Sequence, residues 1–452
     1  MKIIIAGDGK VGATLARQLS AEGHDLTIID FRGEVLSSSI EKYDVMTVTG
    51  NCAALPVLRQ AGAADAELLI AVTNADEVNL LSCMTAHTLN PNIHTIARIR
   101  NPEYTEQVFE MRQQFALSMS FNPEKQAAGE IERLLEFPGF LKRDSFAKDR
   151  VEIVELRVDA QSRLNGVSLM DLDGIVKCKV LVCTVLRNGQ AIMPDGRFVL
   201  KEGDCIFVTA ATNVLATLLK NLGIITRKVK KVLLAGGGRV SYYLAEKLLK
   251  SGMSVCIIER DRERCVELAG RLPKADVLCG DASSQAVLDS ANLEEFDSVV
   301  SLTGMDEVNI LISLYATSRQ VPQVVTKLGH GENIGILDRL PIGSIVCPKE
   351  LSCNNVVRYV RAIEHQSGSA ISIHTIASGQ VEASEFIVDE SSRNCGVPLK
   401  DLTLRKNVLI ACITHGGLTE IPNGDSVFHA GDTVVAVTNA DAALLQFNDI
   451  FA

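Results

Sequence analysis

The chain of 452 residues contains one glycine-rich fingerprint twice, 229 positions apart. The fingerprint positions in IIIAGDGKVG and VLLAGGGRVS are Gly7, Gly9 and Gly12, then Gly236, Gly238 and Ser241. In each copy an acidic residue, Asp30 or Glu259, ends the next apolar run. A fold for this chain must therefore accommodate two copies of the same unit.

The repeat extends beyond the fingerprint into both parts of each half. TNADEVN at 73–79 returns as TGMDEVN at 303–309, and SRLNGVSLMDL at 162–172 returns as SRNCGVPLKDL at 392–402. These matches keep nearly constant spacing, so the chain is a tandem duplication with few insertions. Each half combines a nucleotide-binding pattern with a smaller strand-rich module.

Composition excludes several classes of protein. With 47% hydrophobic and 22% charged residues, the chain can bury ordinary globular cores. Its net charge of −10 argues against binding nucleic acid through the phosphate backbone. The twelve cysteines include no CxxC pair, and most lie in apolar runs, so we expect neither a disulfide framework nor a metal site. We expect no signal peptide, because Asp8 breaks the first apolar run, and no membrane span, because no uncharged apolar stretch is long enough to cross a bilayer.

The order of apolar runs predicts the fold class. Strand, glycine turn, helix and strand open each half, and further apolar runs alternate with helical stretches, which is typical of a doubly wound parallel sheet. Short β-rich runs with turn signals then predict a small α+β module that leans on a neighbour for its core. Asn188 with Gly189, and Gly416 with Gly417, predict hairpin turns that need positive φ.

We therefore expect an α/β protein with two tandem Rossmann-like sheets, each followed by a small α+β domain. The first half divides into a nucleotide-binding domain at 1–122, a crossover helical segment at 123–148 and a small domain at 149–225. The second half divides into the corresponding segments 230–347, 348–366 and 367–452.

Each fingerprint has the context that phosphate binding requires. Gly7 allows a tight turn, Gly9 allows the backbone to approach a pyrophosphate, and Gly12 allows close helix packing. The phosphates would lie at the helix N-terminus, where free amides and the helix dipole favour anions. Asp30 and Glu259 would accept hydrogen bonds from the ribose diol and would repel a 2′-phosphate, which disfavours NADP. ADP and ATP carry the same diol, so the residues alone leave NAD and adenine nucleotides open.

Polar residues also end the later strands of each predicted sheet, at the edge where doubly wound folds bind ligands. Asn51 and Asp281 would line the adenine pocket, and Arg98 and Lys327 would neutralise a phosphate. Thr73, Asn74 and Thr303 end the fourth strands. From topology alone, these residues could equally be polar side chains of solvated loops. Their recurrence in both halves favours a binding site.

A catalytic acid or base is not evident. His87 and His94 are the candidates in the first half, but threonine and glutamine stand at the corresponding positions of the second half. His415 starts a hairpin turn that Arg187 starts in the first copy, and no metal-ligand spacing is found. Three possibilities remain: a regulatory nucleotide sensor, an NAD-dependent oxidoreductase with duplicated cofactor domains, and a purely structural role in which the fingerprints bind no ligand.

The chain resembles the TrkA family of Trk-system potassium uptake regulators, which have tandem RCK domains (regulators of potassium conductance). The segments IIIAGDGKVG, TNADEVN, ARIR, GDAS and IPNGDSVFHAGD carry the resemblance along the whole chain, with departures at Ser241 and Lys327. The resemblance implies a non-enzymatic, cytoplasmic subunit on the inner face of the membrane. It implies binding of NAD or NADH, and of ATP or ADP in some members. It also implies a ring-like homo-oligomer, a tetramer, that gates a potassium-translocating membrane subunit.

The resemblance also implies the residues of the two sites. The first nucleotide would contact Gly7, Asp8, Gly9, Lys10, Val11, Gly12, Asp30, Asn51, Thr73, Asn74 and Arg98. The second would contact Gly236, Gly237, Gly238, Arg239, Val240, Glu259, Gly280, Asp281, Thr303 and Lys327. The helices after Pro123 and Pro348 would link each nucleotide site to the small modules.

Overall fold

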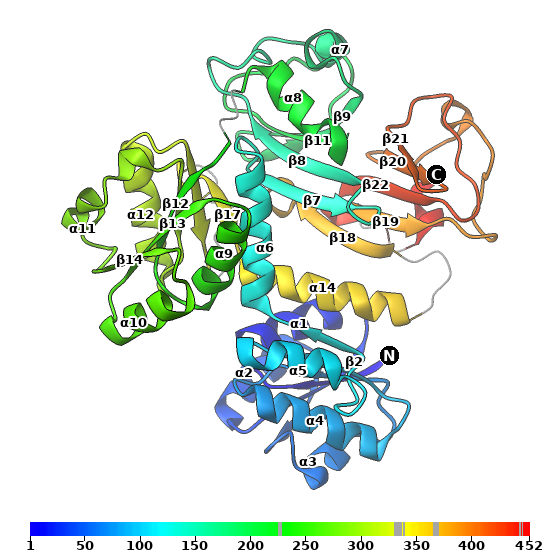
Figure 1. Ribbon diagram of the computed structural model, residues 1–452. Helices are drawn as coiled ribbons and strands as arrows, with labels where there is room; N and C mark the ends of the chain where they lie inside the picture. Colours follow the sequence, from blue (N-terminus) through cyan, green and yellow to red (C-terminus); the bar gives the residue numbers. More distant parts are fainter. Residues whose placement is uncertain (225–227, 330–336, 338–339, 365–369, 443, 445) are drawn as a thin grey trace. The chain divides into compact units, whose positions relative to one another are not determined.

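The computed structural model describes residues 1–452 except 225–227, 330–336, 338–339, 365–369, 443 and 445 (Figure 1). The chain forms two compact units. One comprises Met1–Ala127 with Cys347–Val360, and the other comprises Ala128–Val346 with Arg361–Ala452.

The first unit is built on a six-stranded sheet in the order β3-β2-β1-β4-β5-β6. Its strands are β1 (Lys2–Ala6), β2 (Asp25–Asp30), β3 (Met46–Thr49), β4 (Leu68–Ala71), β5 (His94–Arg98) and β6 (Met119–Phe121). All neighbouring strands pair in parallel. The helices between them are α1 (Lys10–Ala21), α2 (Gly33–Lys42), α3 (Leu55–Gln60), α4 (Asp76–Leu89) and α5 (Thr105–Glu110). This strand order confirms the predicted doubly wound sheet.

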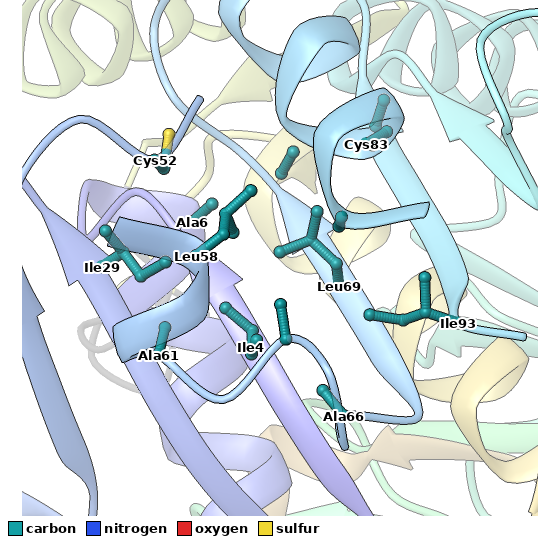
Figure 2. Close-up of a cluster of buried hydrophobic side chains, with 14 of the residues drawn as sticks. Ile4, Ala6, Ile29, Cys52, Leu58, Ala61, Ala66, Leu69, Cys83 and Ile93 are labelled. Atoms are coloured by element: carbon teal, nitrogen blue, oxygen red, sulfur yellow. The ribbon is translucent and has the colours of Figure 1, made fainter. Parts of the chain in front are cut away.

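Alternation of side chains along the strands gives this sheet two buried faces. Ile4, Ile29 and Leu69 point to one face, where Leu58 of α3 and Cys83 of α4 cover them (Figure 2). The intervening residues Ile3, Ile5, Ile28 and Ile70 are buried on the other face. Burial on both faces explains why the strands read as continuous apolar runs.

The second unit contains the corresponding parallel sheet, in the order β14-β13-β12-β15-β16-β17. Its strands are β12 (Lys231–Ala235), β13 (Ser254–Glu259), β14 (Asp276–Cys279), β15 (Ser298–Ser301), β16 (Gln323–Lys327) and β17 (Ser344–Val346). The helices are α9 (Arg239–Lys250), α10 (Arg262–Arg271), α11 (Gln285–Ser290) and α12 (Asp306–Ser318).

Two five-stranded antiparallel sheets form the small modules, in the orders β10-β9-β11-β8-β7 and β18-β19-β22-β20-β21. The first has β7 (Lys142–Phe146), β8 (Val151–Arg157), β9 (Val180–Arg187), β10 (Gln190–Ile192) and β11 (Cys205–Ala211), with helices α7 (Leu172–Val176) and α8 (Leu215–Leu222). The second has β18 (Ala370–Ile376), β19 (Val381–Ile387), β20 (Leu409–His415), β21 (Leu418–Glu420) and β22 (Thr433–Asn439). The predicted hairpin turns are confirmed, with positive φ at Asn188, Gly189, Gly416 and Gly417.

The two small sheets share a hydrophobic core, as the prediction of a module that leans on a neighbour requires. Phe146, Ile153 and Phe207 of the first sheet pack in one buried cluster with Val381 and Val435 of the second. A small sheet gains more buried apolar area by this pairing than it could enclose alone.

Helices α6 (Pro123–Glu136) and α14 (Pro348–Ile363) follow the two parallel sheets. Helix α14 lies beside α1 of the first unit (Figure 1), where Gln18 Nε2 donates to Asn354 Oδ1 at 3.2 Å. In the second unit, Lys247 Nζ of α9 contacts Glu132 Oε2 of α6 at 2.6 Å, and Gln323 Nε2 donates to Leu134 O at 2.8 Å. Each crossover helix thus contacts the nucleotide-binding domain of the other half.

The crossover segment 123–148 contains a strand that was not predicted. Helix α6 ends at Glu136, just before Pro138 and Gly139, and β7 then pairs with β8 of the small sheet. The sequence KRDSF of β7 carries three charged residues, so it lacks the apolar run that marks the other strands. Its charges are paired: Arg143 Nε donates to Glu152 Oε2 at 2.7 Å, and Lys142 Nζ lies 3.1 Å from Asp144 Oδ2.

Candidate functional site

The predicted site residues of the first half gather at the carboxyl edge of the first parallel sheet. The fingerprint loop follows β1, Asp30 ends β2, Asn51 follows β3, Thr73 follows β4 and Arg98 ends β5. The chain leaves β1 and β4 toward opposite faces of the sheet, so this edge is the topological switch point. The corresponding edge of the second sheet gathers the predicted residues of the second half.

Backbone geometry in the first loop requires glycine at Gly7 and Gly12. Gly7 has a φ of 108°, and a Cβ there would lie 2.9 Å from the amide nitrogen of Thr73. A Cβ at Gly12 would lie 1.9 Å from the Gly7 carbonyl oxygen. Gly9 is the N-cap of α1 and makes no side-chain cap, so the first-turn amides near Lys10 are presented to an anion.

Asp30 joins the end of β2 to this loop. Its Oδ2 accepts the main-chain amide of Asp8 at 2.9 Å, and its Oδ1 accepts the amide of Arg32 at 2.9 Å. Burial opposes ionisation of Asp30, but the hydrogen bonds from Arg32 and Asp8 outweigh it and lower the pKa of the carboxyl below its usual value. A carboxylate is therefore held beside the loop at neutral pH.

Asp8 introduces a second buried carboxyl into the first site. Its side chain is 3% exposed, and its Oδ2 accepts a hydrogen bond from Ser39 Oγ at 2.7 Å. Burial, aided by the charge of Asp30, raises the pKa of Asp8 despite that hydrogen bond. The first site thus contains two neighbouring carboxyls with opposite pKa shifts.

The ends of β4 and β5 are joined by a buried asparagine. Asn79 Oδ1 accepts from the amide and the hydroxyl of Thr73 at 2.8 and 2.7 Å, and Asn79 Nδ2 donates to Arg98 O at 2.9 Å. The Arg98 guanidinium donates to Thr73 O at 2.5 Å and to Asn74 Oδ1 at 3.2 Å. Arg98 thereby places positive charge across the switch point.

The remaining predicted residues of the first site differ in exposure. Lys10, Asn51 and Asn74 are exposed, whereas the Val11 side chain is buried against the core. Asn51 Oδ1 accepts the amide of Ala53 at 3.0 Å, so this side chain shapes its own loop. Val11 offers only its main-chain amide to a ligand.

The second loop repeats this geometry with different side chains. Gly236 has a φ of 114°, and Gly238 is the N-cap of α9. Glu259 Oε2 accepts the Gly237 amide at 2.7 Å, as Asp30 accepts the Asp8 amide. A Cβ at Gly237 would lie 2.9 Å from Glu259 Cβ, so the longer acid is matched by a glycine in the loop. Ser241 is accommodated at the third position, where its Oγ donates to the Gly236 carbonyl oxygen.

The strand ends of the second sheet also repeat those of the first. Asn309 accepts from the amide and hydroxyl of Thr303 at 2.8 and 2.7 Å, and it donates to Lys327 O at 2.9 Å. Lys327 Nζ donates to Thr303 O at 2.6 Å. After β14, Gly280 precedes the exposed Asp281, whose pKa is lowered by hydrogen bonds from Ser283. Arg239 is exposed and Val240 is buried, like Lys10 and Val11.

Two pairs of organising residues were not assigned a role from the sequence. Asn79 and Asn309 are fully buried and join strand ends. Asp76 Oδ2 accepts the amides of Arg100 and Asn101 at 2.7 and 2.8 Å, and Asp306 Oδ1 accepts the Gly329 amide at 2.8 Å. The repeat of DEVN at 76–79 and 306–309 was the feature of the sequence that could have indicated their role.

The candidate catalytic histidines lie away from this edge. His94 begins β5, at the amino end of the strand, and lies 3.3 Å from Tyr359 Oη. His87 lies in the last turn of α4 and is exposed. Neither is positioned to exchange a proton with a ligand at the carboxyl edge.

The chain matches two family models, each twice. The TrkA-N domain matches residues 3–116 and 232–348, and the TrkA-C domain matches residues 153–223 and 383–452. These matches correspond to the two parallel-sheet domains and the two small modules.

Curated relatives match along nearly the whole chain. The Trk system potassium uptake protein TrkA of Vibrio alginolyticus is 31% identical, covering 96% of this chain and 95% of its own. The protein of the same name from Halomonas elongata is 32% identical, with the same coverage of 96% and 95%.

Solved structures share the fold. The GsuK RCK domain has a TM-score of 0.61 at 17% identity, covering 97% of this chain and 92% of that one. The GsuK channel bound to NAD has a TM-score of 0.59 at 17% identity, covering 97% and 77%. The duplicated domains, the strand order and the full-length relatives agree, and the chain belongs to the TrkA family of Trk-system potassium uptake proteins.

Proposed function

We propose that this chain is a nucleotide-binding regulatory subunit of a Trk-type potassium uptake system. Its parallel-sheet domains would bind NAD or NADH, with ATP or ADP as further ligands, and would control a membrane subunit that translocates potassium. Membership of a family of RCK-type regulators supports this function over the alternative of an NAD-dependent oxidoreductase.

The observation that carries the proposal is the hydrogen bond between each fingerprint loop and the acid of the next strand. Asp30 accepts the Asp8 amide at 2.9 Å, and Glu259 accepts the Gly237 amide at 2.7 Å. This bond holds a diol acceptor next to a helix N-terminus that can bind phosphate. Each half thus offers a partner for the ribose diol and a partner for the phosphates of an adenosine diphosphate group.

The ligand class is supported by the solved relatives of the fold. Two GsuK structures are described as bound to NAD and to ADP, and both ligands carry the ribose diol that Asp30 and Glu259 would accept. Neither acid would tolerate a 2′-phosphate at close range, so we propose that NADPH is rejected.

The proposed site of action is the cytoplasmic face of the membrane, where a ring of four chains would contact the potassium-translocating subunit. Within the described part of the chain, no helix is both long and apolar enough to cross a bilayer. Gating then requires that nucleotide binds one state of the ring more tightly than the other. The crossover helices α6 and α14 are the proposed link.

Potassium flux in proteoliposomes tests this function. The potassium-translocating subunit is reconstituted with and without this chain, and uptake is measured across a nucleotide series. The proposal predicts a flux that depends on both the chain and the nucleotide. A flux that the chain changes identically with or without nucleotide would contradict the sensor, and turnover of NADH would support the oxidoreductase.

A further inference from the structure

A cluster of potential metal ligands lies in the second small module. His415, His429 and Asp432 each place one donor atom within 4.8 Å of the others, and they form the one such group of three in the described part of the chain. His415 ends β20, and Asp432 directly precedes β22. Because Thr414 pairs with Thr433, the strand register brings His415 and Asp432 side by side.

Asp432 is buried beneath the two imidazoles. Its side chain is 3% exposed, whereas those of His415 and His429 are 69% and 51% exposed. His415 Nδ1 lies 2.6 Å from Asp432 Oδ1, and His429 Nδ1 lies 3.9 Å from Asp432 Oδ2. The His429 amide donates to Asp432 Oδ2 at 2.7 Å, which fixes the carboxylate.

The first small module shows what this position looks like when its role is structural. Arg187, the counterpart of His415, makes two hydrogen bonds of 2.7 Å to Asp204, the counterpart of Asp432. A third bond of 2.8 Å joins Arg187 to Val199 O, and the Phe198 ring centroid lies 4.5 Å from the guanidinium carbon. A permanent cation therefore compensates the buried Asp204 carboxylate.

The second module keeps the buried aspartate but changes the residues around it. His415 replaces Arg187, His429 replaces Lys201, and Ser426 replaces Phe198. A hollow of about 460 Å³ lies at this place, and its lining includes His415, Glu420, Ser426 and His429. An imidazole, unlike a guanidinium, has a nitrogen lone pair that can bind a metal ion. The buried Asp432 carboxylate therefore lacks the permanent guanidinium partner that Asp204 has in Arg187.

We propose that His415, His429 and Asp432 bind a divalent transition-metal ion of the zinc class. Two imidazole nitrogens and one carboxylate oxygen are donors that Zn²⁺ accepts, and three protein ligands leave a position for water or a ligand from the hollow. Zinc bonds of about 2.0–2.2 Å in a tetrahedral site place the ligand atoms about 3.4 Å apart. The His415 nitrogen at 2.6 Å from Asp432 must therefore move slightly away and the His429 nitrogen at 3.9 Å must approach, and the exposed imidazoles can rotate to do so. Asp432, which is held by the His429 amide, provides the fixed point.

Linear spacing gave no indication of this site, because the ligands come from one strand end and from the loop before another strand. The duplication supplies the signal instead, since an arginine and a lysine in one copy correspond to two histidines in the other. The site is separate from the nucleotide-binding edges, so its failure would leave the proposed function unaffected.

Zinc and cobalt titrations test the proposal. The full chain, free of purification tags, carries Cys279→Ser and Cys395→Ser, because these two cysteines are exposed and could bind metal themselves. Zn²⁺ is titrated by calorimetry at pH 7.5, and Co²⁺ is followed by its visible absorption. We expect one tight site per chain, with an affinity at least about tenfold lower in His429→Ala.

The matched control is His415→Arg, which restores the arginine–aspartate pair of the first module. This variant should keep or raise the melting temperature while losing the tight metal site, which separates metal binding from folding. Equal Zn²⁺ affinity in the parent, His429→Ala and His415→Arg, or no tight site in the parent, would overturn the proposal.

Discussion

The main-chain amide of Asp8 donates a hydrogen bond of 2.9 Å to Oδ2 of Asp30. This contact places two buried carboxyls next to each other at the first site, one with a raised pKa and one with a lowered pKa. In the second site Gly237 and Glu259 make the corresponding contact with only one carboxyl. The two sites should therefore respond differently to pH.

Replacing Asp8 by asparagine should stabilise the protein at neutral pH. Burial raises the pKa of Asp8, so the folded state holds this proton more tightly than the unfolded state does. Protonated Asp8 therefore contributes to the free energy of unfolding at low pH, and this contribution is lost as pH rises through the raised pKa of Asp8. Asp8→Asn should thus increase the free energy of unfolding by about 0.5–2 kcal/mol at pH 7, and the gain should shrink toward pH 4. Urea denaturation at both pH values measures it.

The matched control is Asp30→Asn, which should change the free energy of unfolding in the opposite direction. Hydrogen bonds lower the pKa of Asp30, so its contribution is present above the usual carboxyl range and is lost as pH falls. Asp30→Asn should therefore destabilise the protein at pH 7. Equal effects of the two substitutions at both pH values would show that the carboxyls do not have opposite shifts.

Substitution of Gly12 should damage the first site far more than substitution of Ser241 damages the second. A Cβ at Gly12 would lie 1.9 Å from the Gly7 carbonyl oxygen, whereas the Ser241 hydroxyl donates to the corresponding carbonyl of Gly236. Gly12→Ser should cost about 1–3 kcal/mol through overpacking, and Ser241→Gly about 1 kcal/mol through helix propensity. Thermal melts with and without NADH compare them. Full nucleotide binding by Gly12→Ser would contradict the close packing of the first loop.

Removing the Asn79 amide should separate the ends of β4 and β5. Asn79 is fully buried and bonds to Thr73 and Arg98, so Asn79→Ala leaves several buried polar groups without their partner. We expect a loss of about 1–3 kcal/mol in unfolding free energy and weaker nucleotide binding. Thr88→Ala, which removes an exposed hydroxyl bonded within α4, is the control and should change little. A stability of Asn79→Ala equal to that of the control would refute the organising role.

Weakening the packing of α14 should uncouple transport from nucleotide without abolishing binding. Helix α14 contacts α1 directly, with Cys353 Sγ lying 3.8 Å from Val11 O, and Val356 of α14 is fully buried. Val356→Ala should leave the nucleotide Kd nearly unchanged while potassium flux loses its response. Asn355→Ala, at a half-buried position of the same helix, is the matched control. A normal flux response in Val356→Ala would exclude α14 as the link.

The fold was predictable because the apolar runs, the glycine loops and the helical stretches all indicate the same doubly wound sheet. Apolar runs such as IIIA at 3–6 are typical of strands buried on both faces of a parallel sheet, and the glycine loop after them is typical of a tight turn into a helix. The duplication shows each of these patterns a second time. Strand β7 was missed because its burial depends on Arg143 pairing with Glu152, a contact that periodicity does not reveal.

The positions of the site residues were predictable from topology, but their bonding was not. The carboxyl ends of parallel strands meet at one edge, which places Asp30, Thr73 and Arg98 together. That Arg98 bonds to the Thr73 carbonyl, and that Asp8 is buried beside Asp30, depends on side-chain directions. The cluster of His415, His429 and Asp432 likewise depends on strand register.

Calorimetric titration of the purified protein with NADH, NAD, NADPH, ATP and ADP tests the central claim most directly, with Asp30→Ala and Glu259→Ala as single-site variants. A hydrogen bond to a charged acceptor contributes about 1.5–3 kcal/mol, so each variant should lose roughly tenfold to a hundredfold in affinity at its own site. The account predicts binding that rejects NADPH and two losses that each affect one site. Absence of binding, or binding that neither variant weakens, would contradict it.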